Sequence, residues 1–183
     1  YNPQAGTLDG VVVNGPYTKL ISLVIHDTRE GVAVWTPAEG AEVHDCIIYN
    51  NGWQGPDRGH GHGIYTQNNG APKRLTGNII FNQFGVGIHA YGSDKAFVRN
   101  YMVDHNVVFN NGRLSIDGRS DNLFFGSGGS LSGIRVQSNY TYHTPSQDIG
   151  ASRVGWQYGG TNQDVSVLDN YFIGGYIGLS MNS

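Results

Sequence analysis

Two histidines in a glycine-rich run are the clearest candidates for chemistry in this sequence. Residues 59–63 read Gly-His-Gly-His-Gly, which places two imidazoles two positions apart on backbone that glycine leaves conformationally free. Three interpretations are open. The run could form a divalent metal site with His89 or Asp57, an acid–base site, or a tight corner whose histidines only bond backbone. No third ligand follows at a recognised metal spacing, so no metal site is predicted.

Acid–base chemistry on an acidic sugar would combine these histidines with tyrosines and arginines. A neutral histidine near pH 7 can remove the C5 proton of a uronate, and a tyrosine can return a proton to the leaving oxygen. An arginine can neutralise the uronate carboxylate. The predicted catalytic residues are His62, His89, Tyr65, Arg58 and Arg119.

A repeat along the chain must position these residues. Six short apolar segments recur, each opening a new unit: Leu23–Asp27, Cys46–Asn50, Asn78–Asn82, Asn106–Asn110, Asn139–His143 and Asn170–Gly174. Each is followed by a second short strand: Gly31–Val34, Gly63–Thr66, Gly87–Ala90, Asn122–Phe125, Gly155–Tyr158 and Gly178–Met181. One such unit cannot bury its apolar side, but units stacked at about 4.8 Å close a narrow apolar interior. The pattern predicts an all-β solenoid of about six coils.

Asparagine opens four consecutive units, at Asn78, Asn106, Asn139 and Asn170. Superimposed amides can hydrogen-bond up and down a column, so these residues are interpreted as a structural ladder. The whole pattern resembles the right-handed parallel β-helix superfold, the pectin-lyase-like group, over residues 19–183. Residues 1–18 are then an N-terminal partial coil or cap. No capping helix is evident at either end, so the segment is expected to be a fragment of a longer helix.

Three long loops leave one edge of the predicted rod, at residues 52–62, 112–121 and 144–154. Long loops on a rigid scaffold are common places for function. Strand alternation predicts an outward column beside them, comprising Ala33, Tyr65, His89, Phe124, Gln157 and Ser180, with Trp35, Gln67 and Tyr91 next to it. Aromatic rings and amides suit a sugar chain. The predicted substrate-binding residues are Trp35, Trp53, His60, Gln67, Tyr91 and Gln157.

The resemblance implies two enzymatic chemistries and one alternative without catalysis. Residues 61–64 resemble the Gly-His-Gly segment of polygalacturonase-type glycosidases, but residues 35–40 lack the paired aspartates of those enzymes. Inverting hydrolysis needs two carboxylates, so a polysaccharide lyase is ranked above a glycosidase. Pectate-lyase-like relatives generally use Ca²⁺, yet the acidic residues here are too dispersed to support a calcium site, and no cofactor is predicted. The alternative is a structural, adhesin-like or tailspike-like β-helix module.

Composition argues against several other classes of protein. The 183 residues carry a formal net charge of −3, so no basic footprint for nucleic acid is expected. No apolar run approaches the length of a membrane span. The single cysteine, Cys46, excludes an internal disulfide framework. The sequence therefore predicts a secreted or cell-surface protein whose partner is a polysaccharide, and it leaves the oligomeric state open.

Overall fold

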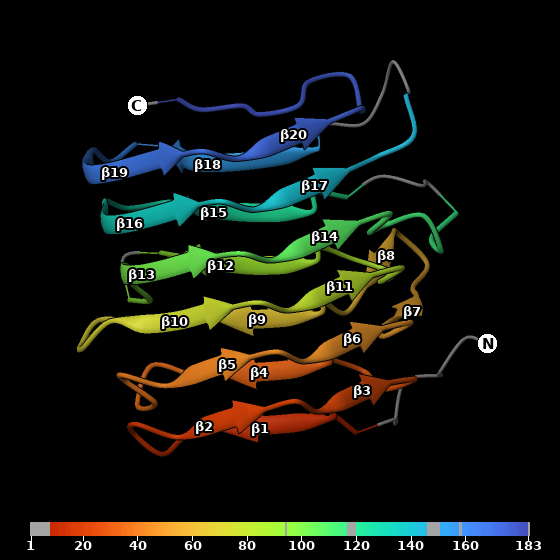
Figure 1. The fold of residues 1–183 in the computed structure, drawn as a ribbon, viewed down its shortest axis with the longest axis horizontal. Coiled ribbons are helices and arrows are strands. Elements are labelled where there is room, and N and C mark those ends of the chain that lie inside the picture. The colour runs from red at the N-terminus through yellow and green to blue at the C-terminus, as the bar shows by residue number, and fades with distance from the viewer. Residues whose placement is uncertain (1–7, 94, 117–119, 146–150, 158, 183) are drawn as a thin grey trace.

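The computed structural model describes residues 8–93, 95–116, 120–145, 151–157 and 159–182. It is a parallel β-solenoid in which the chain passes repeatedly through three sheets, each of six parallel strands (Figure 1). Sheet 1 contains β1 (Val11–Val13), β4 (Val32–Val34), β9 (Ile64–Thr66), β12 (Ile88–Gly92), β15 (Leu123–Ser127) and β18 (Ser152–Gln157). The predicted parallel β-helix is confirmed.

The other two sheets complete each passage of the chain. Sheet 2 contains β2 (Lys19–Ile21), β5 (Glu42–His44), β10 (Lys73–Thr76), β13 (Val98–Asp104), β16 (Leu131–Gln137) and β19 (Asn162–Leu168). Sheet 3 contains β3 (Val24–His26), β6 (Ile47–Tyr49), β11 (Ile79–Phe81), β14 (Val107–Phe109), β17 (Tyr140–Tyr142) and β20 (Tyr171–Ile173). Each strand of sheet 3 lies in one of the six repeat segments found in the sequence. None of the described segments forms a helix of the length and apolarity that a bilayer crossing requires.

The interior is narrow and is filled by one or two side chains from each strand. In sheet 3 the middle residue of each strand points inward, and Ile48, Ile80 and Val108 have no exposed surface. Strand registers superimpose these residues directly, so like stacks on like along the rod. Burying each such side chain contributes roughly 1.5–3 kcal/mol, which makes the stacking of coils the main source of stability.

The predicted asparagine ladder is present. The Asn106 amide nitrogen donates to the Leu75 carbonyl at 2.8 Å and to the Asn139 side-chain oxygen at 2.9 Å. Its own oxygen accepts from the backbone and side chain of Asn78 at 3.0 and 2.9 Å. Cys46 continues the column toward the N-terminus by donating its backbone N–H to Asn78 at 3.0 Å. These contacts satisfy buried backbone groups at a corner where no strand ladder reaches them.

A second amide column, absent from the sequence expectations, lies at the corner between sheets 3 and 1. Asn51 donates to Gln83, the Gln83 backbone donates to Asn111, and Asn111 donates to Asn122, at 2.9–3.2 Å. The residue before each of the first three column members adopts a left-handed conformation, for example φ 55° at Asn50 and at Asn82. Asparagine tolerates this conformation better than other residues with a side chain, which explains the recurring Asn-Asn and Asn-Gln pairs.

Glycine opens three successive strands of sheet 1 because nothing larger fits. A Cβ on Gly63 would lie 2.6 Å from the Gly87 carbonyl oxygen, and one on Gly31 would lie 2.5 Å from that of Gly63. The backbones of consecutive coils therefore leave no room for a side chain at this corner, immediately before the strands that carry the candidate site.

The register of sheet 1 corrects one sequence expectation. Phe124 pairs with Arg153, not with Gln157, and the register shifts between Phe125 and Gly126. The outward column is therefore Ala33, Tyr65, His89, Phe124 and Arg153, followed by Ser180 through an isolated bridge. The placement of Gln157 in this column was wrong because β18 begins earlier than expected, so that Ala151, and not Gly155, aligns with Asn122.

Candidate functional site

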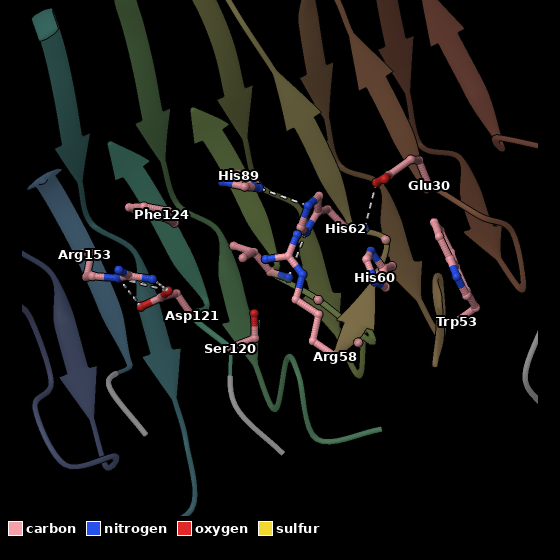
Figure 2. A pocket seen from close by; sticks show the side chains of 14 residues that line it. Glu30, Trp53, Arg58, His60, His62, His89, Ser120, Asp121, Phe124 and Arg153 are labelled. Atoms are coloured by element: carbon pink, nitrogen blue, oxygen red, sulfur yellow. Dashed lines mark hydrogen bonds and ion pairs between the residues drawn. The ribbon is translucent and has the colours of Figure 1, made fainter. Parts of the chain in front are cut away.

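A pocket of about 250 Å³ opens where the strands of sheet 1 begin, beside the long loop of residues 52–62 (Figure 2). Its walls come from successive coils and from the loops that interrupt them. The lining residues are Glu30, Trp53, Arg58, Gly59, His60, Gly61, His62, Gly85, Val86, His89, Ser120, Asp121, Phe124 and Arg153. Residues from distant parts of the chain meet here because the stacking of coils superimposes equivalent positions.

His62 connects three coils at the floor of the pocket. Its Nδ1 accepts the Val86 backbone N–H at 2.9 Å, so this nitrogen carries no proton in the neutral ring. The proton therefore sits on Nε2, which donates to His89 Nδ1 at 3.0 Å. Burial lowers the pKa of His62 well below its usual value, and His89 and Arg58 add to the effect. Both nitrogens of His62 are thus engaged, and neither is free to take a proton from a ligand.

His89 Nδ1 accepts the hydrogen bond that His62 Nε2–H donates, so the proton of the neutral His89 ring is on its Nε2. Burial lowers the pKa of His89 to about 3, with Arg153 and Arg58 contributing. Its ring lies flat on Phe124, with centroids 5.0 Å apart and planes 13° apart, and it also contacts the ring of Tyr65 at 5.1 Å. This stack holds His89 as a neutral hydrogen-bond donor, not as a base.

Glu30 is the titratable group of the pocket that the sequence analysis missed. Its carboxylate accepts the backbone N–H of His62 at 2.7 Å. Burial raises the pKa of Glu30 to about 7, and the bond from His62 opposes that rise. A carboxyl group that is half ionised near pH 7 can take or give a proton under ordinary conditions.

Asp121 and Arg153 close the opposite side of the pocket. The Arg153 Nε lies 3.1 Å from both carboxylate oxygens of Asp121, and the guanidinium lies over the Phe124 ring at 4.0 Å. Asp121 is only 5% exposed. Burial raises the pKa of Asp121, and the bonds from Arg153 oppose that rise. The two side chains are matched in charge and geometry, so the ion pair connects the coil of β15 to that of β18.

The loop after β6 forms the outer wall. Its two short antiparallel strands, β7 (Trp53–Gln54) and β8 (Gly59–His60), bring the Trp53 and His60 rings into a stack with centroids 5.0 Å apart. Asp57 lies 2.7 Å from His60 Nε2, which orients the imidazole. Gln54 accepts the backbone N–H of Ile116 at 2.8 Å, so the loops of two different coils support each other. Figure 2 shows Arg58 reaching from this loop toward the histidine pair.

The structure brings five of the residues predicted from sequence into the pocket lining: Arg58, His62, His89, Trp53 and His60. Tyr65, Trp35, Gln67 and Tyr91 lie beside it on the outer face of sheet 1. Trp35 packs edge-on against Tyr65 at 5.4 Å, and Gln67 donates to the Tyr91 carbonyl at 3.4 Å. Arg119 lies outside the described residues. Gln157 ends β18, away from the pocket column, and its side chain is also outside what the structure describes.

A signal for the missed residues was present in the repeat. Backbone bonds run from Gly31 to His62, from Gly63 to Val86 and from Gly87 to Asp121. The residue preceding each strand-opening glycine or asparagine therefore belongs to one column, which contains Glu30, His62, Val86 and Asp121. Aligning the residue before the glycine would have placed Glu30 next to His62, and Asp121 two steps further along the same column.

Metal binding finds no support in the part of the chain that the structure describes. No group of three or more histidine, cysteine, aspartate or glutamate side chains there is arranged to hold an ion. His60 is bonded to Asp57 and His62 to His89, so the two histidines of the Gly-His-Gly-His-Gly run have separate partners.

Comparison with known proteins identifies the fold. A family model described as a right-handed beta helix region matches residues 10–183. Neither the curated proteins nor the solved structures contain a significant match to the chain.

Proposed function

This chain belongs to the right-handed β-helix family, and on that premise we propose that it binds an acidic polysaccharide in the pocket and cleaves it by β-elimination. The fold alone does not select a reaction, because this architecture hosts many functions. The proposal rests on one observation, which is that Glu30, with a pKa of about 7, shares a pocket with the guanidinium of Arg58.

Arg58 supports an anionic ligand. Its charge helps to lower the pKa values of both His62 and His89, so it acts on the centre of the pocket. Within the lining, Asp121 is matched by Arg153. Arg58 is largely exposed and lies 3.7 Å from Asp57, which is outside the lining, so its guanidinium can turn toward an anionic group in the pocket. A uronate carboxylate would pair with Arg58, which would also stabilise the negative charge that develops at C5.

Glu30 takes the part of the base that the sequence analysis assigned to histidine. In its ionised form it removes the C5 proton, the C–H electrons form the C4=C5 double bond, and the C4–O bond breaks. The departing oxygen takes a proton from water. His62 and His89 hold the pocket floor in place, with His62 bonded to Glu30 through its backbone N–H. The reaction needs no oxidant, reductant or metal ion.

Hydrolysis fits the pocket less well, although two carboxyl groups line it. Glu30 and Asp121 are separated by three strand steps along their column, which corresponds to roughly 14 Å between backbone positions. Inverting hydrolysis uses carboxylates about 6.5–9.5 Å apart. Asp121 is also engaged by Arg153 through both oxygens.

The test is to incubate the protein with uronate polymers and to follow the ultraviolet absorbance of the unsaturated product. Wild-type protein is expected to produce it, and Glu30→Gln to lose at least a hundredfold in rate while still binding the polymer. Glu42→Gln, on the outer face of sheet 2, is the matched control and should retain activity. New reducing ends without ultraviolet absorbance would indicate hydrolysis and overturn the elimination chemistry.

A non-catalytic β-helix that binds polysaccharide is the second candidate. It is favoured by the hydrogen bonds that engage His62 and Asp121 within the protein. Polymer binding that Arg58→Ala weakens, without any product, would select this alternative. Either function places the protein where extracellular polymers are found, so secretion or display at the cell surface is part of the proposal.

A further inference from the structure

The outer face of sheet 3 is apolar along the whole rod, in contrast to that of sheet 2. Registers align the first residues of its strands into one column and the last residues into another. The first column is Val24, Ile47, Ile79, Val107, Tyr140 and Tyr171; the second is His26, Tyr49, Phe81, Phe109, Tyr142 and Ile173. We call these twelve residues the apolar face. No lysine, arginine, aspartate or glutamate is among them, whereas Lys19, Glu42, Arg74, Asp104 and Arg135 lie on sheet 2.

The first column of the apolar face is exposed without a break. The exposed fractions of its members run from 37% at Val107 to 66% at Tyr171. Isolated apolar residues on a surface need no explanation, but a continuous apolar strip across six strands does.

The second column argues against a sugar as the occupant of this face. The rings of His26, Tyr49, Phe81 and Phe109 stack on one another with centroids 4.8–5.2 Å apart and planes within 16° of parallel. The flat faces of these rings are therefore covered by the neighbouring rings, and the ring edges point outward. A sugar needs the face of a ring to stack on, which this column does not offer. Ring edges and aliphatic side chains suit contact with another apolar protein surface.

We propose that the apolar face docks against the same face of a second copy of this chain. The exposed column alone corresponds to roughly 500 Å² of apolar surface, so two copies would bury about 1,000 Å² in total. That area is at the lower limit for a specific interface and implies weak, concentration-dependent association. The interface is independent of the pocket, which lies on sheet 1.

Self-pairing is the arrangement that the chemistry of this face favours. Apart from His26, which is bonded to Asp27 at one end of the face, its members carry no ionisable group that would be desolvated at neutral pH when the face meets itself, and they offer little to attract a charged partner. Aligned strands give parallel ridges, which can interdigitate with those of a two-fold related copy, as the inner faces of packed sheets do about 10 Å apart. A two-fold axis also closes the assembly and leaves no apolar face exposed.

The test is sedimentation velocity of the intact chain over a hundredfold range of concentration. Wild-type protein is expected to shift from monomer to dimer as concentration rises. Ile79→Lys puts a charge at the centre of the apolar face and should weaken association at least tenfold. Thr76→Lys adds the same charge on sheet 2, in the same coil, and should leave association unchanged.

Circular dichroism melting of all three proteins would establish that both variants remain folded. The proposal would be overturned by a monomer at every concentration, by association that Ile79→Lys leaves intact, or by a defined species other than a dimer. The experiment uses no polysaccharide, so its failure is distinguishable from failure of the proposed elimination reaction.

Discussion

Glu30 shows how neighbouring residues shift the pKa of a carboxyl group into the range useful for proton transfer. Its carboxyl group is partly buried above the His62 N–H, in a column that also brings the charge of Asp9 close to it. Burial and Asp9 both disfavour the ionised form, while the His62 N–H favours it. The balance places the pKa of Glu30 at about 7. A surface glutamate would be fully ionised at that pH and would be a much weaker base.

This balance predicts the direction of the pH dependence of the elimination reaction. The reaction requires ionised Glu30, so the rate should rise with pH through about 7 and then level off. At pH 6 about one tenth of the maximal rate is expected, because roughly that fraction of Glu30 is ionised. Initial rates of unsaturated product formation between pH 5 and 9 would measure it. A rate that is flat or falls between pH 6 and 8 would remove Glu30 from the role of base.

The elements that carry the fold are corners as much as strands, since each strand of sheet 3 is only three residues long. Such short strands need the amide columns to satisfy the backbone groups between them. Asn106 occupies the middle of the first ladder and is 1% exposed. Its side chain accepts two hydrogen bonds from Asn78, so its loss leaves polar groups unpaired in two coils.

Asn106→Leu should therefore lower the free energy of unfolding by about 3 kcal/mol, because buried amides and carbonyls lose their partners without access to water. Asn170→Leu is the matched control at the partly exposed end of the ladder, where water can replace some of the lost bonds, and its effect should be about half as large. Urea unfolding of both variants would measure the difference. Equal effects would mean that the ladder does not act as a buried network.

Sequence patterns predicted sheets 1 and 3 but not sheet 2, and the reason lies in the backbone. Most strands of sheets 1 and 3 follow a glycine or an asparagine and alternate inward and outward side chains. Three longer strands of sheet 2 contain an equivalent residue in the left-handed conformation, Asn100, Gly133 or Asp164, with φ 53–63°. Each of these residues interrupts the alternation of inward and outward side chains. Apolar residues therefore no longer recur at every second position in these strands, and the sequence gives no strand signal.

The candidate site was predictable where a local pattern marked it. His89 was found because β12 alternates inward and outward side chains, and His62 because it lies in the Gly-His-Gly-His-Gly run; their hydrogen bond is a consequence of the coil spacing. Arg153 was missed because the sequence placed this strand at residues 155–158, whereas β18 begins at Ser152 and brings Arg153 beside Phe124. The pKa of Glu30 depends on burial by residues from other coils, which no local pattern encodes.

At the scale of the whole molecule, each coil contacts the coils next to it, so adjacent coils determine how far a side chain is buried. Three histidines lie in the corners and on the pocket floor, where stacking removes them from water. Burial lowers the pKa values of His62, His89 and His143, and for His89 the value is about 3. Each must stay neutral in the folded chain, whereas in the unfolded chain each can bind a proton at about pH 6.5.

Acid should consequently unfold this solenoid. A histidine with a lowered folded-state pKa contributes stability that is fully present above about pH 6.5 and is lost as the pH falls toward the folded value. For His89 that loss is about 2 kcal/mol at pH 5, since one unit corresponds to about 1.4 kcal/mol. Glu30 has the opposite sign: its raised pKa stabilises the fold below about pH 4.5, and that contribution disappears as the pH rises through about 7.

Three histidines with lowered pKa values, His62, His89 and His143, outnumber the two carboxyl groups with raised pKa values, Glu30 and Asp121, so the net effect expected on acidification is loss of stability. His89→Gln removes one histidine, so its free energy of unfolding should fall less between pH 7 and pH 5 than that of the wild type, by about 2 kcal/mol. Urea unfolding at the two pH values would measure this difference. His105→Gln, at an exposed histidine bonded to Asp104, is the control for the substitution itself and should leave the free energy of unfolding at pH 7 close to that of the wild type. An equal fall in stability for His89→Gln and wild type would show that the His62–His89 pair accepts protons freely, and the tautomers assigned to the pocket floor would then be incorrect.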